Sequence, residues 1–231
     1  MRGLFVVFGA WLPLLATIAA VACPLFIVGL LVDSFALRLA CKPWPHLALL
    51  AWLAASAPTG ERDGRYRRDL FAGIALCMVA DFLLEFRAGF FLAGMAVFAL
   101  GHLAFTAALL AKCRSVAIAR LVPVFAYLAA VYLLIEPGLA SMRVPVTIYM
   151  AVIGVMIWRA AAGLGTGGDP TPRQWLALGG AAVFGFSDTL IALDRFHAPI
   201  AGARIAIIVT YWAALWLLAA SAARRLDDAR E

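Results

Sequence analysis

Long apolar runs separated by short polar stretches dominate the hydrophobicity pattern of this chain. The runs cover residues 5–31, 44–57, 69–85, 89–110, 116–135, 143–163, 173–192 and 201–222. A helix needs about 20 apolar residues to cross roughly 30 Å of hydrocarbon, and most of the runs have about that length. They are continuous and lack the alternation expected of a β-barrel strand. The pattern predicts an all-α fold, a polytopic membrane bundle of eight transmembrane helices formed by a single domain over residues 1–231.

Two of these runs depart from a simple span. The first is long and contains Pro13 and Pro24, which predicts a kinked helix, and the second is short. The N-terminal run also resembles a signal peptide with a cleavage box at Cys23. We favour an uncleaved helix, because the apolar run continues past that cysteine. Loop composition occurs at residues 58–68 and in the Gly/Pro-rich stretch 163–173.

Composition and charge place the chain in a membrane. It is 65% hydrophobic and 14% charged, whereas soluble domains are about half apolar and about a quarter charged. With eight spans and an internal N-terminus, thirteen of the nineteen Lys and Arg residues fall at inner helix ends, and the cluster at 61–69 anchors this bias. The other six are Arg38, Lys42, Arg87, Arg143, Arg195 and Arg204. The net charge of +6 therefore indicates a multi-pass cell-membrane protein with both termini cytoplasmic, and not a partner for nucleic acid.

Two aspartates lie inside apolar segments, Asp81 in LCMVADFLL and Asp188 in VFGFSDTLIAL. On insertion scales a carboxylate at the centre of a membrane helix costs roughly 2.5–3.5 kcal/mol, so such acids are rare and typically functional. Both are near the same end of their segments. We expect them to form the catalytic centre, although a structural ion pair or hydrogen bond is the alternative for each.

The spacing of polar residues is consistent with a duplication of four helices. Lys42 precedes Asp81 by 39 residues, and Tyr149 precedes Asp188 by 39 residues. Two repeats of four helices would be parallel, and the two aspartates would then lie at one depth. The alternative is that membrane helices of similar length give similar spacings by chance.

Two charged residues are predicted to support Asp81. Glu85 lies one helical turn after Asp81, so the two carboxylates share a helix face, unless Glu85 is a solvated charge at the helix end. Lys42 begins the second helix within KPWP. Its ammonium either reaches the membrane surface or points inward as a counter-ion for the acids or for a lipid phosphate.

Other polar groups fall within the later helices. His102 lies mid-membrane and either bonds a neighbouring helix or takes part in proton transfer. Tyr149 and Tyr211 each provide a hydroxyl for packing or for function. Ser187 precedes Asp188 and is expected to orient it or water, since no Gly-x-Ser-x-Gly elbow surrounds it. His46 and His197 are at helix ends and are expected to be interfacial.

With these residues in place, the chain resembles the lysoplasmalogenase (YhhN-like) family of eight-helix membrane proteins. The resemblance runs through KPWP (42–45), ADFLLE (80–85) and the pair Gly101-His102. It continues through PVTIYMAVIGVM (145–156) and GGAAVFGFSDTLIAL (179–193) to Tyr211. The segment SDTLIAL is the most specific of these.

The resemblance implies hydrolysis of the vinyl ether bond of a lysoplasmalogen, without a metal or other cofactor. Two carboxyls suit this chemistry. One, kept neutral by the low dielectric, would protonate the enol ether, and the other would stabilise the oxocarbenium ion and activate water, as in paired-carboxylate glycosidases. The expected partners are a lysophospholipid substrate and the bilayer.

Two other readings of the same residues stay open. Acids and a histidine in a membrane bundle also fit a proton-coupled transporter or channel, for which broken helices at the midplane would be expected. A metal-dependent membrane lipid hydrolase would use His102 with the two aspartates, but the chain lacks the paired histidines typical of such sites. The sequence leaves the head group, the chain length and the oligomeric state open.

Overall fold

The computed structural model describes residues 2–56, 60–86 and 89–222, and these residues form helices without strands. The α-helices are α1 (Arg2–Leu31), α2 (Phe35–Cys41), α3 (Pro43–Ala55), α4 (Glu61–Glu85), α5 (Phe91–Lys112), α6 (Leu121–Ile135), α7 (Arg143–Gly163), α8 (Pro172–Phe196) and α9 (Ala203–Ala222). Short 3-10 turns cover Ile118–Arg120, Glu136–Gly138 and Ala140–Met142. Apart from α2, the helices match the eight predicted from the apolar runs.

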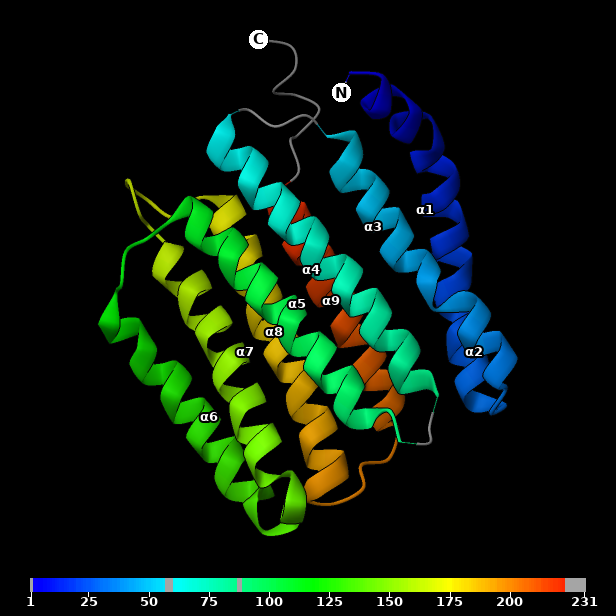
Figure 1. Ribbon diagram of the computed structural model, residues 1–231, viewed down its shortest axis with the longest axis vertical. Coiled ribbons are helices and arrows are strands. Elements are labelled where there is room, and N and C mark those ends of the chain that lie inside the picture. The colour runs from blue at the N-terminus through cyan, green and yellow to red at the C-terminus, as the bar shows by residue number, and fades with distance from the viewer. Residues whose placement is uncertain (1, 57–59, 87–88, 223–231) are drawn as a thin grey trace.

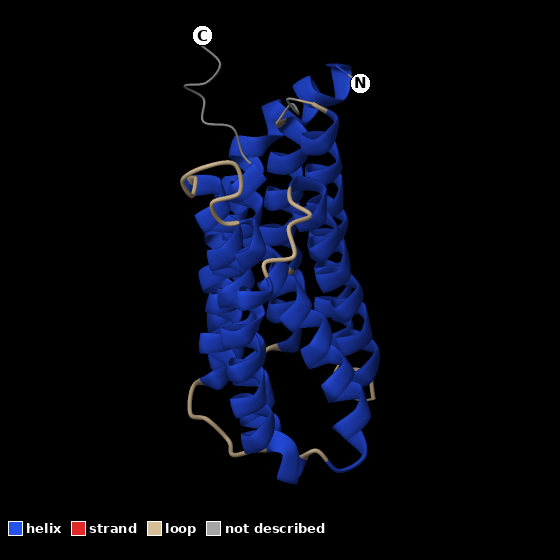
Figure 2. Cartoon of the chain, turned by 90° about the vertical axis from the view of Figure 1, so that its left-hand side faces the viewer, coloured by secondary structure: helices blue, strands red, loops and turns tan. Residues whose placement is uncertain are grey.

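The long helices run lengthwise through one bundle, with the described loops at its two ends (Figures 1 and 2). Helices α4, α5, α8 and α9 lie in the middle, α1 to α3 flank them on one side, and α6 and α7 on the other. The beginning of α1 and the end of α9 lie at the same end of the bundle, as an even number of crossings requires. Helices α4, α5, α8 and α9 run without a break in their helical structure, so they lack the discontinuity expected of a transporter.

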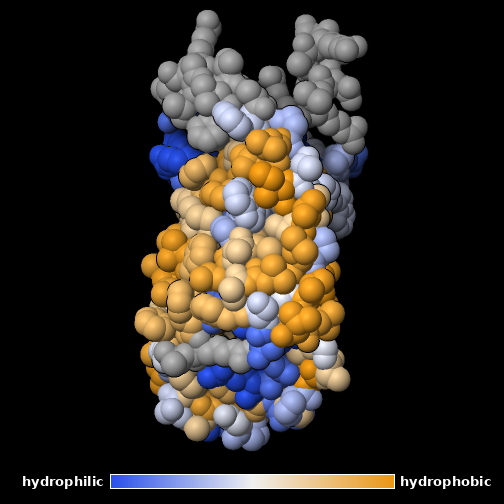
Figure 3. Space-filling model, turned by 90° about the vertical axis from the view of Figure 1, so that its right-hand side faces the viewer, coloured by the Kyte–Doolittle hydropathy of each residue, from blue (hydrophilic) through white to orange (hydrophobic). Residues whose placement is uncertain are grey.

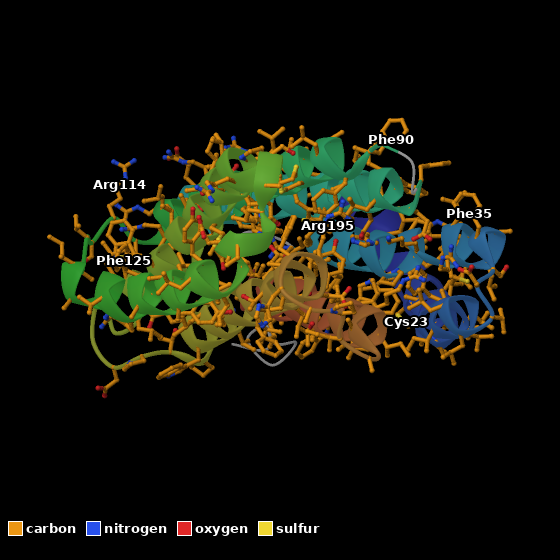
Figure 4. All side chains as sticks on the ribbon, turned by 90° about the horizontal axis from the view of Figure 1, so that it is seen from below. Cys23, Phe35, Phe90, Arg114, Phe125 and Arg195 are labelled. Carbon is orange, nitrogen blue, oxygen red and sulfur yellow. The ribbon has the colours of Figure 1, made fainter. Side chains whose placement is uncertain are left out.

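The surface of the bundle is suited to lipid. Among the described residues, six helices are long and apolar enough to cross a membrane, while α3 has 13 residues and α4 begins with a charged turn. Large hydrophobic side chains such as Leu133 and Val144 are exposed, and hydrophobic residues cover the middle of the face shown in Figure 3. Phe35 and Phe90 lie at the outer rim in the view of Figure 4. The chain is a multi-pass membrane protein.

One helix boundary and one additional helix differ from the sequence-based prediction. Helix α4 begins at Glu61, so most of the segment predicted as a loop at 58–68 is helical, while residues 57–59 lie outside the described part. Glu61 and Asp63 lie in the first turn of α4, where the positive end of the helix dipole stabilises their negative charges. Glu61 also forms an i,i+4 ion pair of 2.8 Å with Arg65. Helix α2 was not predicted. It begins after Ser34, whose hydroxyl accepts a hydrogen bond from the Leu37 amide.

Two glycines at matching places let the central helices approach closely. Gly73 lies eight residues before Asp81, and Gly180 lies eight residues before Asp188. A Cβ atom at Gly73 would come within 2.3 Å of the Phe105 ring on α5, and one at Gly180 within 2.9 Å of the Leu218 amide nitrogen on α9. Small residues let membrane helices pack closely where no hydrophobic effect drives them together. The pairs α4–α5 and α8–α9 are thus built alike, with the two aspartates near corresponding ends.

Candidate functional site

Three basic side chains, from α2, from the junction after it and from α3, face the acids of α4. Arg38, Lys42 and His46 follow one another at intervals of four residues, and the Lys42 amide donates to the Arg38 carbonyl oxygen at 3.0 Å. This bond continues the helical pattern from α2 into α3, so the three side chains share one face. Asp81 and Glu85 are also four residues apart, on the face of α4 that packs against them.

The two faces join in an ordered set of contacts, which we call the charged ladder (Arg38, Lys42, His46, Asp81 and Glu85). Arg38 Nε donates to Glu85 Oε1 at 2.5 Å. Lys42 Nζ bridges the two carboxylates, 3.1 Å from Glu85 Oε2 and 3.4 Å from Asp81 Oδ1. His46 Nε2 lies 3.2 Å from Asp81 Oδ2. Each acid therefore contacts two groups from the opposite helices.

Burial makes these contacts significant. Lys42 is 8% exposed, Asp81 4% and His46 0%. Charges removed from water are tolerated when they are paired, and two cations here balance two carboxylates. Helix α2 is too short to span the membrane. Burial opposes the charged form of its Arg38, but the hydrogen bonds and charges of Glu85 and Asp33 outweigh burial and raise the pKa of this guanidinium. Arg38 therefore stays charged beside Glu85.

Asp188 on α8 has different neighbours. The Tyr149 hydroxyl on α7 donates to Asp188 Oδ2 at 2.6 Å. His102 Nε2 on α5 lies 3.7 Å from the same oxygen, beyond hydrogen-bonding distance. The His102 ring is fully buried and packs edge-on against Phe184, with ring centroids 4.5 Å apart. Phenol and aromatic groups therefore surround Asp188 where charges surround Asp81.

Aromatic rings connect the two surroundings. Phe184 contacts His102 on one side and Tyr211 on the other, with a centroid distance of 5.3 Å to Tyr211. The Tyr211 hydroxyl forms a hydrogen bond of 2.8 Å with His46 Nε2, which itself reaches Asp81. The two aspartates thus belong to one packed network.

Two cavities meet beside Asp188. A polar cavity of about 180 Å³ is lined by charged and hydroxyl-bearing residues from α4, α8 and α9 and by Lys42 at the junction of α2 and α3. Among them are Lys42, Asp81, Glu85, Ser187, Asp188, Arg204 and Tyr211. An apolar cavity of about 70 Å³ lies between α4, α5, α6, α7 and α8, and Tyr149 lines it. The two cavities share Leu84, Phe98, Asp188 and Ile191. A carboxyl at this junction can reach both a polar and an apolar part of one amphiphile.

The structure brings the predicted site residues together, with some adjustments. Lys42 points inward, and Glu85 is a buried member of the charged ladder instead of a solvated helix end. Ser187 lines the polar cavity, but its hydroxyl donates to the Ile207 carbonyl oxygen of α9 at 3.0 Å. It therefore ties α8 to α9. His102 lies near Asp188 but lines neither of the two cavities.

The interpretation of His46 as an interfacial residue was wrong. Its position near the start of α3 indicated a surface, but the ring is buried, with Asp81 of α4 and Tyr211 of α9 against it. Arg38 was likewise treated as a basic residue at a helix end. The spacing Arg38–Lys42–His46 against Asp81–Glu85 was the sequence signal that could have identified both residues.

The donor set of this region does not form a metal centre. Over the described ranges, no group of three or more His, Cys, Asp or Glu side chains is arranged to hold a metal ion. What the arrangement offers is two carboxyls on one cavity, one beside an ammonium and an imidazole, and the other beside a phenol. Such a pair suits acid–base chemistry.

Comparison with known proteins gives a consistent set of relatives. A family model described as the YhhN family matches residues 37–222. Lysoplasmalogenase TMEM86A of Bos taurus is 35% identical over 156 residues, which are 66% of this chain and 64% of that protein. Lysoplasmalogenase TMEM86B of Homo sapiens is 31% identical over 185 residues, 79% of this chain and 74% of that protein. The chain thus spans somewhat less than two thirds of the TMEM86A relatives. No solved structure matches it.

Proposed function

Since the chain belongs to the YhhN family, we propose that it is a membrane hydrolase that cleaves the vinyl ether bond of lysoplasmalogens. The products would be a fatty aldehyde and a glycerophospho-base. The names of its relatives support this substrate class, and the two cavities that meet at Asp188 support it independently. The observation that carries the proposal is that Asp81 and Asp188 line one cavity while differing in their neighbours.

The substrate fits the two cavities by its polarity. The glycerophosphate would occupy the polar cavity, whose lining includes the basic residues Lys42 and Arg204. The first carbons of the alkenyl chain would enter the apolar cavity, and the remaining chain would extend into the bilayer, because the cavity is too small for a whole fatty chain. The vinyl ether then lies at the junction, next to Asp188.

The surroundings of the two acids support different roles for them. Lys42 and His46 stabilise a negative charge on Asp81, so Asp81 is the carboxylate that activates water. Asp188 serves as the general acid, because the Tyr149 hydroxyl is its hydrogen-bond donor and aromatic rings pack around the neighbouring His102. The Tyr149 hydroxyl donates to Oδ2, which leaves Oδ1 to carry the acidic proton.

The reaction balances with water as the co-reactant. Asp188 gives its proton to the β-carbon of the vinyl ether, and the electron pair of the double bond forms the new C–H bond. Water attacks the resulting oxocarbenium ion and gives a proton to Asp81, so that a hemiacetal forms. In its collapse the hemiacetal hydroxyl returns a proton to Asp188, and the leaving glycerol oxygen takes the proton from Asp81. Both carboxyls regain their starting states.

Substitution of the acids tests this proposal. Purified protein should release aldehyde from a lysoplasmalogen but not from its saturated alkyl-ether analogue. Asp81→Asn and Asp188→Asn should each reduce kcat by about 10⁴-fold or more, at the upper end of general acid–base contributions, because an amide can neither donate the proton nor activate water.

Two matched controls lie on the same helices. Asp69→Asn on α4 and Asp194→Asn on α8 change carboxyls outside the cavities, and we expect them to keep activity near the wild-type level. Robust aldehyde release from either cavity variant would remove that aspartate from the mechanism. Equal turnover of the alkyl ether would exclude vinyl ether chemistry.

We also propose that both ends of the chain face the cytoplasm, as the distribution of basic residues predicts. The loops after α5 and α7 lie at the same end of the bundle as the start of α1 (Figure 1). Reporter fusions at residues 64, 113, 168 and 231 should therefore all report the cytoplasm. A periplasmic signal from one of them would contradict the orientation.

A further inference from the structure

The two aspartates lie near one end of the bundle. In α4, Asp81 comes four residues before the last residue and twenty after the first, and in α8, Asp188 comes eight before the last and sixteen after the first. At about 1.5 Å per residue, they are about 6 and 12 Å from the nearer helix ends, and about 30 and 24 Å from the farther ones. We call the nearer end of the bundle the site end. The other, where α1 begins and α9 ends, is the terminal end (Figure 1).

Both cavities at the aspartates lie in the half of the bundle next to the site end. Helices α1, α4 and α8 run toward this end, and the polar cavity is lined by their second halves, beginning at Phe26, Asp81 and Ser187. Helix α9 runs back from it and contributes residues 204–211 of its first half. The apolar cavity extends inward to Gly185, where a Cβ atom would come within 2.6 Å of the Ile157 side chain. The cavities thus end near the middle of the bundle.

The bundle between the aspartates and the terminal end is filled. Leu70 of α4 and Leu218 of α9 are fully buried there. Nearer to the terminal end, the buried Arg67 donates to the carbonyl oxygens of Leu53 and Ala222 at 2.5 and 3.0 Å, and so ties α4 to α3 and α9. A separate cavity of about 240 Å³ at this end shares none of its described lining residues with the two at the aspartates. The described residues therefore leave the aspartates accessible from the site end.

An aromatic pair closes the apolar cavity on the side of the water. Phe91 is the first residue of α5 and Phe196 the last of α8, and both line the cavity with their ring centroids 6.5 Å apart. The exposed Arg195 guanidinium lies 3.8 Å from the centre of the Phe91 ring, a cation–π contact. Figure 4, a view from the site end, shows Arg195 near the middle of the bundle. An apolar chain in this cavity would therefore point toward the membrane midplane.

This arrangement fits an upright lipid of the adjacent leaflet. The head-group region on each side of the hydrocarbon is roughly 5–8 Å thick, so carboxyls about 6–12 Å from the helix ends lie near the boundary between head groups and chains. The vinyl ether of a lysoplasmalogen joins the glycerol to the chain at that boundary. With its phosphate toward Lys42 and its chain toward the midplane, the lipid would reach the aspartates without a change of depth or orientation.

On the basis of the proposed hydrolysis, we infer that the protein takes its substrate from one leaflet only, the leaflet at the site end, opposite both chain termini. A lipid of the other leaflet would have to carry its phosphate through the hydrocarbon, where an unpaired charge is costly. The protein therefore hydrolyses the lysoplasmalogen of one leaflet and leaves that of the other. With both termini in the cytoplasm, as proposed above, the substrate pool is the leaflet that faces away from the cytoplasm.

Vesicles of known protein orientation test the inference. Full-length protein with an affinity tag after Glu231 is reconstituted into phosphatidylcholine vesicles, at less than one protein per vesicle on average. An affinity resin separates vesicles with the tag outside from vesicles with the tag inside. Lysoplasmalogen is then added from outside, so that it enters the outer leaflet, and aldehyde release is measured before and after the addition of detergent.

We expect vesicles with the tag inside to hydrolyse the added substrate about as fast as after detergent. Vesicles with the tag outside should be at least about tenfold slower until detergent is added, because the head group must first cross the hydrocarbon. A fluorescent lysophosphatidylcholine with a membrane-impermeant quencher checks that added lipid stays in the outer leaflet. Equal rates in the two kinds of vesicle, or a faster rate with the tag outside, would overturn the inference.

Two variants serve as controls for the vesicle assay. Asp194→Asn changes a carboxyl of α8 that lines neither cavity at the aspartates, and it should keep the difference between the two kinds of vesicle. Asp188→Asn provides the background rate of aldehyde release.

A labelling experiment separates the choice of leaflet from the chemistry. A saturated alkyl-ether lysophospholipid with a photoreactive group in its chain is added to the same vesicles. With the tag inside, residues 185–196 of α8 should carry label that excess lysoplasmalogen displaces, and with the tag outside this displaceable label should be lost. That pattern without aldehyde release in detergent would remove the proposed hydrolysis but support binding from one leaflet. Equal displaceable labelling from both sides would contradict it.

Discussion

Asp81 and Asp188 hold matching places in two similar helix pairs, but the groups around them differ in charge. Asp81 contacts an ammonium and an imidazole, and Glu85 extends its charged ladder to Arg38. Asp188 contacts the Tyr149 hydroxyl and lies near a buried imidazole among aromatic rings. The direct neighbours of Asp81 on α4 are thus charged or basic groups, whereas those of Asp188 on α8 are a hydroxyl and aromatic rings.

This difference shows how one bundle can provide an acid and a base. A carboxyl beside cations favours its ionised form, whereas one beside neutral groups in low dielectric favours its proton. In the proposed mechanism the two helix pairs supply similar frames, and the neighbours of each aspartate decide its role. Each helix pair also contributes a residue to the surroundings of the other aspartate. His102 on α5 lies near Asp188, and Tyr211 on α9 forms a hydrogen bond with His46, which contacts Asp81. The network therefore needs both halves.

The largest expected effect among the supporting residues comes from Lys42→Met, which removes the cation shared by Asp81 and Glu85. Two buried carboxylates would then share less positive charge, and Asp81 would take up a proton and lose its role as a base. We expect kcat to fall by about 10²–10⁴-fold, the full range for loss of an acid–base group. Steady-state aldehyde release measures this.

Arg143→Met is the comparison for Lys42→Met. Arg143 pairs with Glu136 at the same end of the bundle, but it lines neither cavity at the aspartates. Its loss should change kcat little. If Lys42→Met keeps wild-type kcat while the protein remains folded, the charged ladder does not control Asp81.

A smaller effect is expected on the uncharged side. Tyr149→Phe removes the hydroxyl that donates to Asp188 Oδ2 and keeps the ring. The loss of one hydrogen bond, about 0.5–3 kcal/mol depending on the charge of its partner, corresponds to a fall in kcat on the order of tenfold. Stopped-time aldehyde assays at saturating substrate check it.

Tyr127→Phe provides the matched control, because the Tyr127 hydroxyl bonds Thr189 next to Asp188 on α8. It should leave kcat within about twofold of the wild type, since surface hydrogen bonds contribute little. A loss from Tyr149→Phe greater than that from Lys42→Met would reverse the comparison between the two halves.

Much of the fold and part of the site could be predicted from the sequence. The lengths of the apolar runs predicted eight helices, because a helix must have a minimum length to cross the hydrocarbon. The high cost of a charge inside the membrane singled out Asp81 and Asp188 as candidate site residues. Helix α2 was not predicted, because seven residues give too short a hydrophobic pattern. The burial of His46 was not predicted, because a position at a helix end does not show which other helices pack against it. The partners of each aspartate, and hence their unequal surroundings, depend on contacts between helices far apart in the chain.

The central claim is that Asp188 is protonated and Asp81 ionised in the resting protein. Infrared spectroscopy of the full-length protein in lipid vesicles at pH 7 tests this through the carbonyl stretch of a protonated carboxyl group. The account predicts a band that shifts in heavy water, disappears in Asp188→Asn and persists in Asp81→Asn. A band that persists in Asp188→Asn but disappears in Asp81→Asn would contradict the assignment of the acid and the base.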